Sequence, residues 1–298
     1  MPRLSEPHRV LIASGLAVER ITMSYLQQVH TGRRPQGIRV AICAQEKMGK
    51  TTLACGAPGS LLVPLEVGYE SVTTPKTPMI QTWDELQALQ SEIFASAQQG
   101  QFPYRTIVYD SATALERMIH DKTLSRDPAY GKGNAKAITM ESALGGYGKA
   151  YTYANELFDM FLKQCDQLAV HGNINIILTC HAFASKMVDP QSGEYDSWDI
   201  LLHSPKNNKT YGKREMLTQW VDMLGFLYEP MYITKGEDNV AKGISANKGR
   251  VLGLSRTPAY VAGNRYGIVG EIPIPQQMGW NYLADAIHKS SGVDVFTR

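Results

Sequence analysis

The chain has 298 residues, of which 43% are hydrophobic and 19% charged, and this composition is typical of one globular α/β domain with appendages. A net charge of +2 leaves only local basic patches as an argument for a nucleic-acid partner. No apolar run approaches the ~18 residues that a membrane span needs. The four cysteines form no C-x-x-C pair and no signal peptide is evident, so we expect reduced thiols and a cytoplasmic protein.

The N-terminal segment predicts an amphipathic helix over residues 9–30. Gly and Pro residues in "TGRRPQG" (31–37) end it, which separates an N-terminal helical arm (1–36) from a main domain (37–298). The arm either packs on its own core or contacts another subunit. Its apolar positions are Val10, Leu11, Leu16, Val18, Ile21, Tyr25 and Leu26.

The main domain alternates apolar runs with helical patterns. The runs predict buried strands at 38–43, 61–65, 105–109, 174–179 and 220–228, and the helical patterns cover 83–99, 111–124 and about 147–171. This alternation predicts an α/β fold with a doubly wound, mostly parallel sheet. Glycines and alternating apolar residues then predict a β-rich C-terminal extension (about 235–298) that ends in a short helix near 279–290.

A phosphate-binding loop is predicted directly after the first strand. The pattern [A/G]-x-x-x-x-G-K-[S/T] would cradle phosphate on backbone N–H groups, with Lys50 at the β- and γ-phosphates and Thr51 on Mg²⁺. ATP and Mg²⁺ are therefore the predicted ligands. The predicted binding segment is Ala44, Gln45, Glu46, Lys47, Met48, Gly49, Lys50, Thr51 and Thr52.

Ala44 departs from the usual form of this loop, which opens with glycine. Alanine is acceptable there if its φ is negative. The alternative is that "KMGK" is only a basic connection between a strand and a helix.

Three further polar residues follow other predicted strands. Asp110 is a candidate metal ligand or simply the cap of the next helix, and Glu66 is a candidate base for the attacking water or a solvated loop residue. His181 could sense the γ-phosphate or be structural. Because parallel strands end at one edge of a sheet, we expect these side chains on the same rim as Lys50.

The chain resembles the phage-encoded RecA-like nucleotide-binding proteins, P-loop ATPases linked to single-strand annealing recombination. The resemblance runs from about residue 39 to 287. It rests on the order and spacing of "AQEKMGKTT", "LEVGYESV", "TWDELQAL", "TIVYDSATALERM", "GGYGKAYTYANE", "NIILTCHAF", "YDSWDILLHSP", "WVDMLGFLY", "GRVLGLSRTPAYVAGNRYG" and "GWNYLADAI".

The resemblance implies a RecA-like fold with a role for each rim residue: Lys50 and Thr51 for phosphate and Mg²⁺, Asp110 as the second acidic residue, and Glu66 as the catalytic glutamate. It also matches His181 to the family's strand-end histidine. Near the C-terminus the family carries a Lys-Asn-Arg run that completes a neighbouring subunit's site. Here the run is "GNR", so Arg265 remains as the catalytic candidate and a homo-oligomer is implied.

Two basic loops, 130–151 and 203–215, combine lysines with tyrosines in a way that fits a single-stranded DNA groove. Solvated surface loops are the alternative. The DNA-binding candidates are Lys132, Lys136, Lys149, Lys206, Lys209, Tyr211, Lys213 and Arg214.

The sequence thus predicts an ATP-hydrolysing, RecA-like recombination protein that binds single-stranded DNA and promotes annealing or strand pairing. The alternative is a nucleotide-binding structural or regulatory oligomer with little turnover, which the departures at Ala44 and Gly263 favour. A helicase or packaging motor fits less well, because we find no accessory region.

Overall fold

The computed structural model describes residues 29, 31, 36–132, 138–190, 193–205, 211–235, 241–245 and 249–295, with backbone alone for 232–235 and 241–245. The chain divides into two units, Met1–Pro35 and Gln36–Arg298. The helix predicted at 9–30 lies outside the described residues. The account below concerns the second unit.

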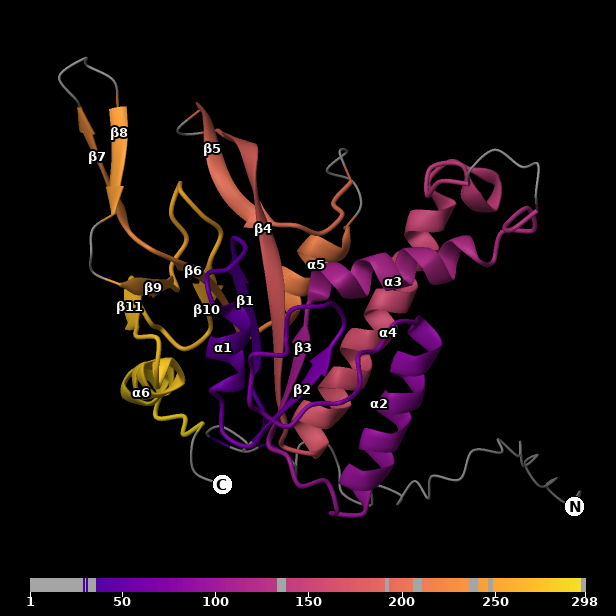
Figure 1. The fold of residues 1–298 in the computed structure, drawn as a ribbon, viewed down its shortest axis with the longest axis horizontal. Coiled ribbons are helices and arrows are strands. Elements are labelled where there is room, and N and C mark those ends of the chain that lie inside the picture. Colours follow the sequence, from indigo (N-terminus) through magenta and orange to yellow (C-terminus); the bar gives the residue numbers. More distant parts are fainter. Residues whose placement is uncertain are drawn as a thin grey trace, which may run out of the picture. The chain divides into compact units, whose positions relative to one another are not determined.

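The second unit is built on one large, mostly parallel sheet (Figure 1). Its order is β11-β9-β6-β1-β4-β3-β2, in which β2, β3, β4, β1 and β6 run parallel and β9 pairs antiparallel with both β6 and β11. The five predicted strands are confirmed. Their bounds are β1 Arg39–Ala44, β2 Ser60–Pro64, β3 Thr106–Asp110, β4 Asn175–Asp189 and β6 Met223–Tyr228.

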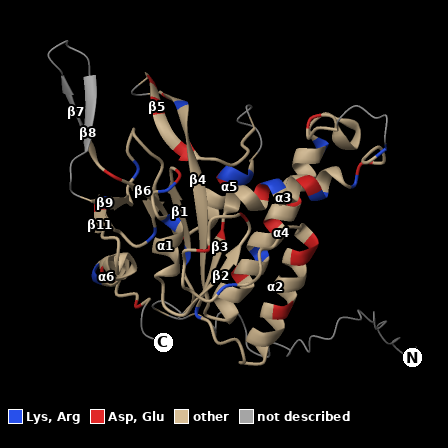
Figure 2. Ribbon diagram, viewed as in Figure 1, with Lys and Arg blue, Asp and Glu red and all other residues tan. Residues whose placement is uncertain are grey.

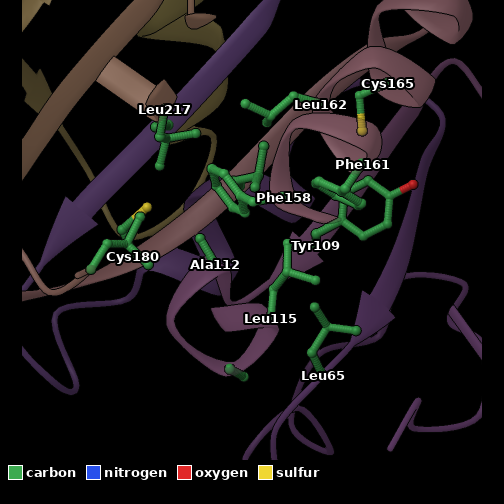
Figure 3. Packing of buried hydrophobic residues seen from close by; sticks show 14 of the residues in the cluster. Leu65, Tyr109, Ala112, Leu115, Phe158, Phe161, Leu162, Cys165, Cys180 and Leu217 are labelled. Atoms are coloured by element: carbon green, nitrogen blue, oxygen red, sulfur yellow. The ribbon is translucent and has the colours of Figure 1, made fainter. Parts of the chain in front are cut away.

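Helices cover both faces of this sheet, because alternate residues of each buried strand point to opposite sides. Ile107 and Leu178 pack against α2, α3 and α4, whereas Ile42 and Val108 pack against α1 and α6. Figure 3 shows Tyr109 of the sheet among side chains of α3 and α4. The bounds are α1 Lys50–Cys55, α2 Trp83–Gln98, α3 Ala112–Leu124, α4 Lys149–His171, α5 Lys213–Trp220 and α6 Gly279–Ser291, with a short 3₁₀ helix at Ala143–Gly145.

The helix starts follow local sequence signals. Thr82 and Glu85 form a reciprocal capping box at the start of α2. At α3 the Ala114 N–H donates to the Ser111 hydroxyl, 3.2 Å away, so Ser111 is the N-cap. This assignment leaves the preceding Asp110 free for other contacts.

The C-terminal part is β-rich, as predicted, and most of it continues the main sheet. Strands β9 (Arg250–Gly253) and β11 (Glu271–Ile274) form the edge, and β10 (Gly263–Asn264) pairs with β6. Strands β7 (Met231–Lys235) and β8 (Ala241–Ser245) form a separate hairpin. Strand β5 (Gly193–Ile200), which the sequence analysis missed, pairs with the second half of β4. In the described part of the chain, no helix is both long and apolar enough to cross a membrane.

The register of the parallel strands brings their carboxyl ends together. Ala44 of β1 lies opposite His181 of β4, and Asp110 of β3 lies between Pro64 of β2 and Thr179 of β4. The loops that follow β1, β2 and β3 therefore start from one edge of the sheet, which is where open α/β sheets bind ligands.

Candidate nucleotide-binding site

The segment between β1 and α1 has the geometry of a phosphate loop. Ala44 is the last residue of β1, extended and fully buried, so an opening glycine is not required here. Gly49 has a φ of 86°, the left-handed region that favours glycine. A Cβ on Gly49 would also lie 2.0 Å from Nη1 of Arg250, so a larger residue would displace this guanidinium from the loop.

Lys50 begins α1 with its ammonium group buried beneath the loop. Only 7% of the residue is exposed, and Nζ donates to the carbonyl oxygens of Ala44 (3.1 Å) and Gln45 (2.9 Å). Burial lowers the pKa of Lys50, although nearby groups, Asp110 among them, oppose the shift. A bound polyphosphate would supply the anionic partner that this buried cation lacks among its hydrogen bonds.

Thr51 and Asp110 meet directly, as a magnesium site requires. The Thr51 hydroxyl donates to Oδ2 of Asp110 (2.7 Å), and the Thr179 hydroxyl donates to Oδ1. The alternative that Asp110 caps α3 is not realised, because Ser111 does so. A hydroxyl and a carboxylate fit Mg²⁺, a hard cation that commonly takes one or two protein oxygens together with phosphate oxygens and water.

Glu66 and His181 form a hydrogen-bonded pair beside the loop. Oε1 of Glu66 lies 2.8 Å from Nε2 of His181, and Oε2 accepts from Arg117 (3.1 Å). Burial alone would raise the pKa of Glu66, but the hydrogen bonds from His181 and Ser111 and the Arg117 charge outweigh it, so the pKa is lowered. Glu66 is thus an ionised, anchored carboxylate with a side chain 22% exposed, not a solvated loop residue.

His181 also faces the phosphate loop. Its Nδ1 lies 3.8 Å from Oε1 of Glu46, and its backbone N–H donates to the Thr113 hydroxyl. The imidazole therefore stands between the loop after β1 and the segment after β2, in a position to couple the two.

Arg250 contacts the phosphate loop and was missed by the sequence analysis. From β9 its Nη1 donates to the carbonyl of Met48 (2.8 Å), and its Nη2 donates to the carbonyl of Pro275 (3.3 Å). The residue follows the loop by about two hundred positions in an ordinary "KGRVLG" segment. No local signal marks it; only the antiparallel addition of β9 beyond β6 brings it to the loop.

Arg265 lies at the other end of the sheet from its own phosphate loop. It follows β10 and contacts Asp222 through Nη1 (3.0 Å), next to the start of β1 and β6. Because β1 places about 17 Å between Arg39 and Ala44, Arg265 is distant from the phosphate loop of its own subunit, and its predicted role in a neighbouring subunit's site stays a prediction.

The predicted DNA-binding residues divide into three groups. Lys136, Lys206 and Lys209 lie outside the described residues. Lys132, Lys149 and Tyr211 are exposed. Lys213 and Arg214, expected on a mobile loop, instead begin α5 (Figure 2).

Lys213 and Arg214 are both committed to acidic partners. Lys213 is fully buried, and its Nζ lies 3.4 Å from Oε1 of Glu116, so its predicted contact with DNA is wrong. Arg214 is ion-paired with Asp199 (2.6 Å) and Glu215 (3.0 Å). A phosphate would have to compete with those carboxylates, and the predicted DNA contact of Arg214, whose side chain is 25% exposed, stays a prediction.

The buried Lys213 leads to a prediction about pH. His120 Nε2 lies 3.1 Å from Lys213 Nζ, with Glu116, Glu141, His203 and Tyr151 around it. Burial and the Lys213 charge lower the pKa of His120 from 6.5 to about 3. A histidine whose pKa is lowered in the folded state leaves the protein most stable above the unfolded pKa. Stability is then lost as the pH falls from the unfolded pKa of 6.5 toward the folded pKa of about 3. Between pH 7.5 and 5 we expect His120 to cost about 2 kcal/mol of unfolding free energy, which urea denaturation measures.

His120→Gln tests that origin, because glutamine stays neutral across the range. The variant should lose clearly less stability than the wild type between pH 7.5 and 5. His288→Gln, in the exposed last turn of α6, should keep the full dependence. Equal acid losses in the wild type and His120→Gln would show that His120 does not set the dependence.

Comparison with known proteins places this site in a family. A search of curated protein sequences returned no match. The family model described as an AAA domain matches residues 36–266, a range that contains the phosphate loop, Glu66, Asp110, His181 and Arg250. Because the match covers most of the chain, this protein belongs to the AAA domain family and carries an AAA-type, P-loop ATPase-like domain.

Proposed function

We propose that this protein is a magnesium-dependent ATPase of the RecA-like type. One observation carries the proposal: the buried Lys50, the Thr51–Asp110 contact and the anchored Glu66 gather at one edge of the sheet. Phosphate binding, metal binding and water activation need different side chains, and these follow or end different strands: Lys50 and Thr51 follow β1, Glu66 follows β2 and Asp110 ends β3. A strand-to-helix connection without a nucleotide role would not need this convergence.

The residues divide the chemistry between them. The loop and Lys50 hold the phosphates, Thr51 and Asp110 would hold Mg²⁺, and the metal when bound offsets the phosphate charge. Ionised Glu66 accepts a proton from the attacking water. His181 orients that carboxylate and links it to the loop through Glu46.

We further propose that the protein acts in phage recombination by binding single-stranded DNA and promoting annealing. The RecA-like resemblance and the exposed Lys132, Lys149 and Tyr211 support this, since lysines hold phosphates and a tyrosine can stack on a base. The proposal includes a homo-oligomer. Arg265, at the far end of the sheet with 55% of its side chain exposed, would reach a nucleotide only in a neighbouring copy.

A nucleotide-binding oligomer with little turnover is the second candidate. One observation favours it: both carboxylate oxygens of Glu66 already have partners, His181 and Arg117. Ala44 does not favour this second candidate, because strand β1 accommodates an alanine at that position.

Steady-state phosphate release, with and without Mg²⁺ and a single-stranded oligonucleotide, tests the proposal. We expect magnesium-dependent release that the oligonucleotide stimulates, and DNA binding that weakens steeply with salt. ATP binding without release under any condition would instead support the second candidate. Mass photometry with ATP, with ADP and with the oligonucleotide reports the assembly; a monomer under all three conditions would contradict the oligomer.

A further inference from the structure

A pocket of about 350 Å³ opens next to the phosphate loop, between α1 and the segment that joins β11 to α6. Thr52 and Leu53 of α1 line one wall, and Ile274 to Trp280 line another. All of this second wall lies beyond residues 36–266, the part of the chain that the family model matches. The volume is in the range of small-ligand sites.

The pocket lining combines apolar surface with neutral polar groups. Val72 and Met278 offer apolar faces, and Met278 is 70% exposed. Ser71, Gln276 and Gln277 supply hydroxyl and amide groups. The lining residues that the structure describes include no carboxylate, so the pocket suits a neutral, flat, polar-edged ring better than a cation.

Trp280 of this wall also carries a hydrogen-bond donor without a partner among the described residues. The residue is 1% exposed, and its indole N–H is buried with no partner in the described structure. Buried polar atoms in native proteins are nearly always paired, so this N–H is available to a hydrogen-bond acceptor that reaches it.

Arg250 joins the pocket to the phosphate loop. The residue lines the pocket, and its guanidinium donates to the carbonyl oxygens of Met48 in the loop and Pro275 in the pocket wall. Thr52, which follows the loop's Lys-Thr pair, also lines the pocket. Pocket and loop are therefore two parts of one continuous surface.

We infer that this pocket binds the nucleoside of the ATP whose phosphates the loop holds. Glu66, Asp110 and His181, which the γ-phosphate end needs, contact the loop or one another and are not among the residues that line the pocket. The nucleoside must then extend the opposite way, over α1, where the pocket opens. This inference rests on the proposed function, since it requires ATP on the loop.

Two variants separate nucleoside binding from phosphate binding. Met278→Gly removes an apolar face at a residue whose φ is 58°, where glycine fits without strain, and Ser71→Trp fills the exposed mouth. Tyr147→Gly, also at positive φ and 99% exposed, and Ser91→Trp on α2 are the matched controls. Each protein is titrated with ATP and with inorganic tripolyphosphate, both with Mg²⁺, by calorimetry.

We expect the wild type to bind ATP at least about tenfold more tightly than tripolyphosphate. Met278→Gly and Ser71→Trp should lose about tenfold or more in ATP affinity while tripolyphosphate affinity stays within twofold, and the controls should match the wild type. Equal wild-type affinity for both ligands, or pocket variants with full ATP affinity, overturns the pocket but leaves the ATPase proposal standing. A wild type that binds neither ligand overturns both.

Discussion

Replacing Lys50 with methionine should abolish most ATP binding without destabilising the free protein. The ammonium group is buried with only carbonyl oxygens as hydrogen-bond acceptors, and burial lowers its pKa, which means that the fold bears a cost for holding it charged. Methionine keeps the length and removes that cost. ATP loses its charge-assisted contact, so we expect affinity to fall by at least about 100-fold, or roughly 3 kcal/mol.

Thermal denaturation with and without ATP and Mg²⁺ measures both halves of this expectation. The unfolding midpoint of free Lys50→Met should equal or exceed that of the wild type, while the ATP-induced rise disappears. Lys163→Met, at an exposed position on α4, should keep the full rise. A variant that still responds to ATP like the wild type would mean that Lys50 does not contact the nucleotide.

The strands that carry this site could be predicted because each is buried on both faces. "RVAICA" and "TIVYD" are almost uninterrupted apolar runs, and a strand covered by helices on both sides has no polar face to obscure it. Strand β5, "GEYDSWDI", alternates polar residues and pairs with the second half of β4, whose residues are largely exposed or half-exposed. Nothing in its composition separates it from a loop.

Helix α5 was missed for a different reason. "KREMLTQW" begins with two charged residues and comes shortly after "KNNK", and this charge density predicts a basic loop. Lys213 is buried because Glu116, one turn into α3, supplies its counter-charge. Lys213 and Glu116 are 97 positions apart in the sequence, so the local charge density indicated an exposed loop where the lysine is in fact buried.

The strand-end residues of the site were predictable, and their partners were not. Asp110 and His181 end apolar strands, and the parallel register alone places them near the phosphate loop. Thr179, Arg117 and Arg250 enter through side-chain contacts between elements distant in sequence. Sequence patterns define where a strand ends, whereas these contacts depend on how helices and edge strands pack afterwards.

Replacing Glu66 with glutamine should stop ATP hydrolysis while preserving ATP binding. Glutamine keeps the size of the side chain and can still hydrogen-bond to His181 and Arg117, but it cannot accept a proton from water at neutral pH. General-base catalysis contributes about 10²–10⁴-fold, so we expect kcat to fall at least about 100-fold with ATP affinity within threefold. Phosphate release and calorimetric titration measure the two quantities.

The ionisation of Glu66 gives this prediction a second readout. Burial would raise the pKa of Glu66, but the contacts with His181, Ser111 and Arg117 together lower it below its ordinary 4.5, so the carboxylate stays ionised throughout the neutral range. Loss of wild-type kcat between pH 8 and 6 would therefore have to come from another group. Glu66→Asp, which keeps the charge on a shorter side chain, should recover part of the rate, and Glu92→Gln on α2 should retain all of it.

The effect of Glu66→Gln distinguishes the two candidate functions. If Glu66 activates water, Glu66→Gln holds ATP in an unhydrolysed complex, and any assembly that requires ATP persists instead of turning over. If Glu66 only anchors His181 and Arg117, the variant releases phosphate at the wild-type rate, because glutamine can keep both contacts. Mass photometry of wild type and Glu66→Gln over time after ATP addition distinguishes these cases, since only the first predicts that the variant's oligomer outlasts the wild type's.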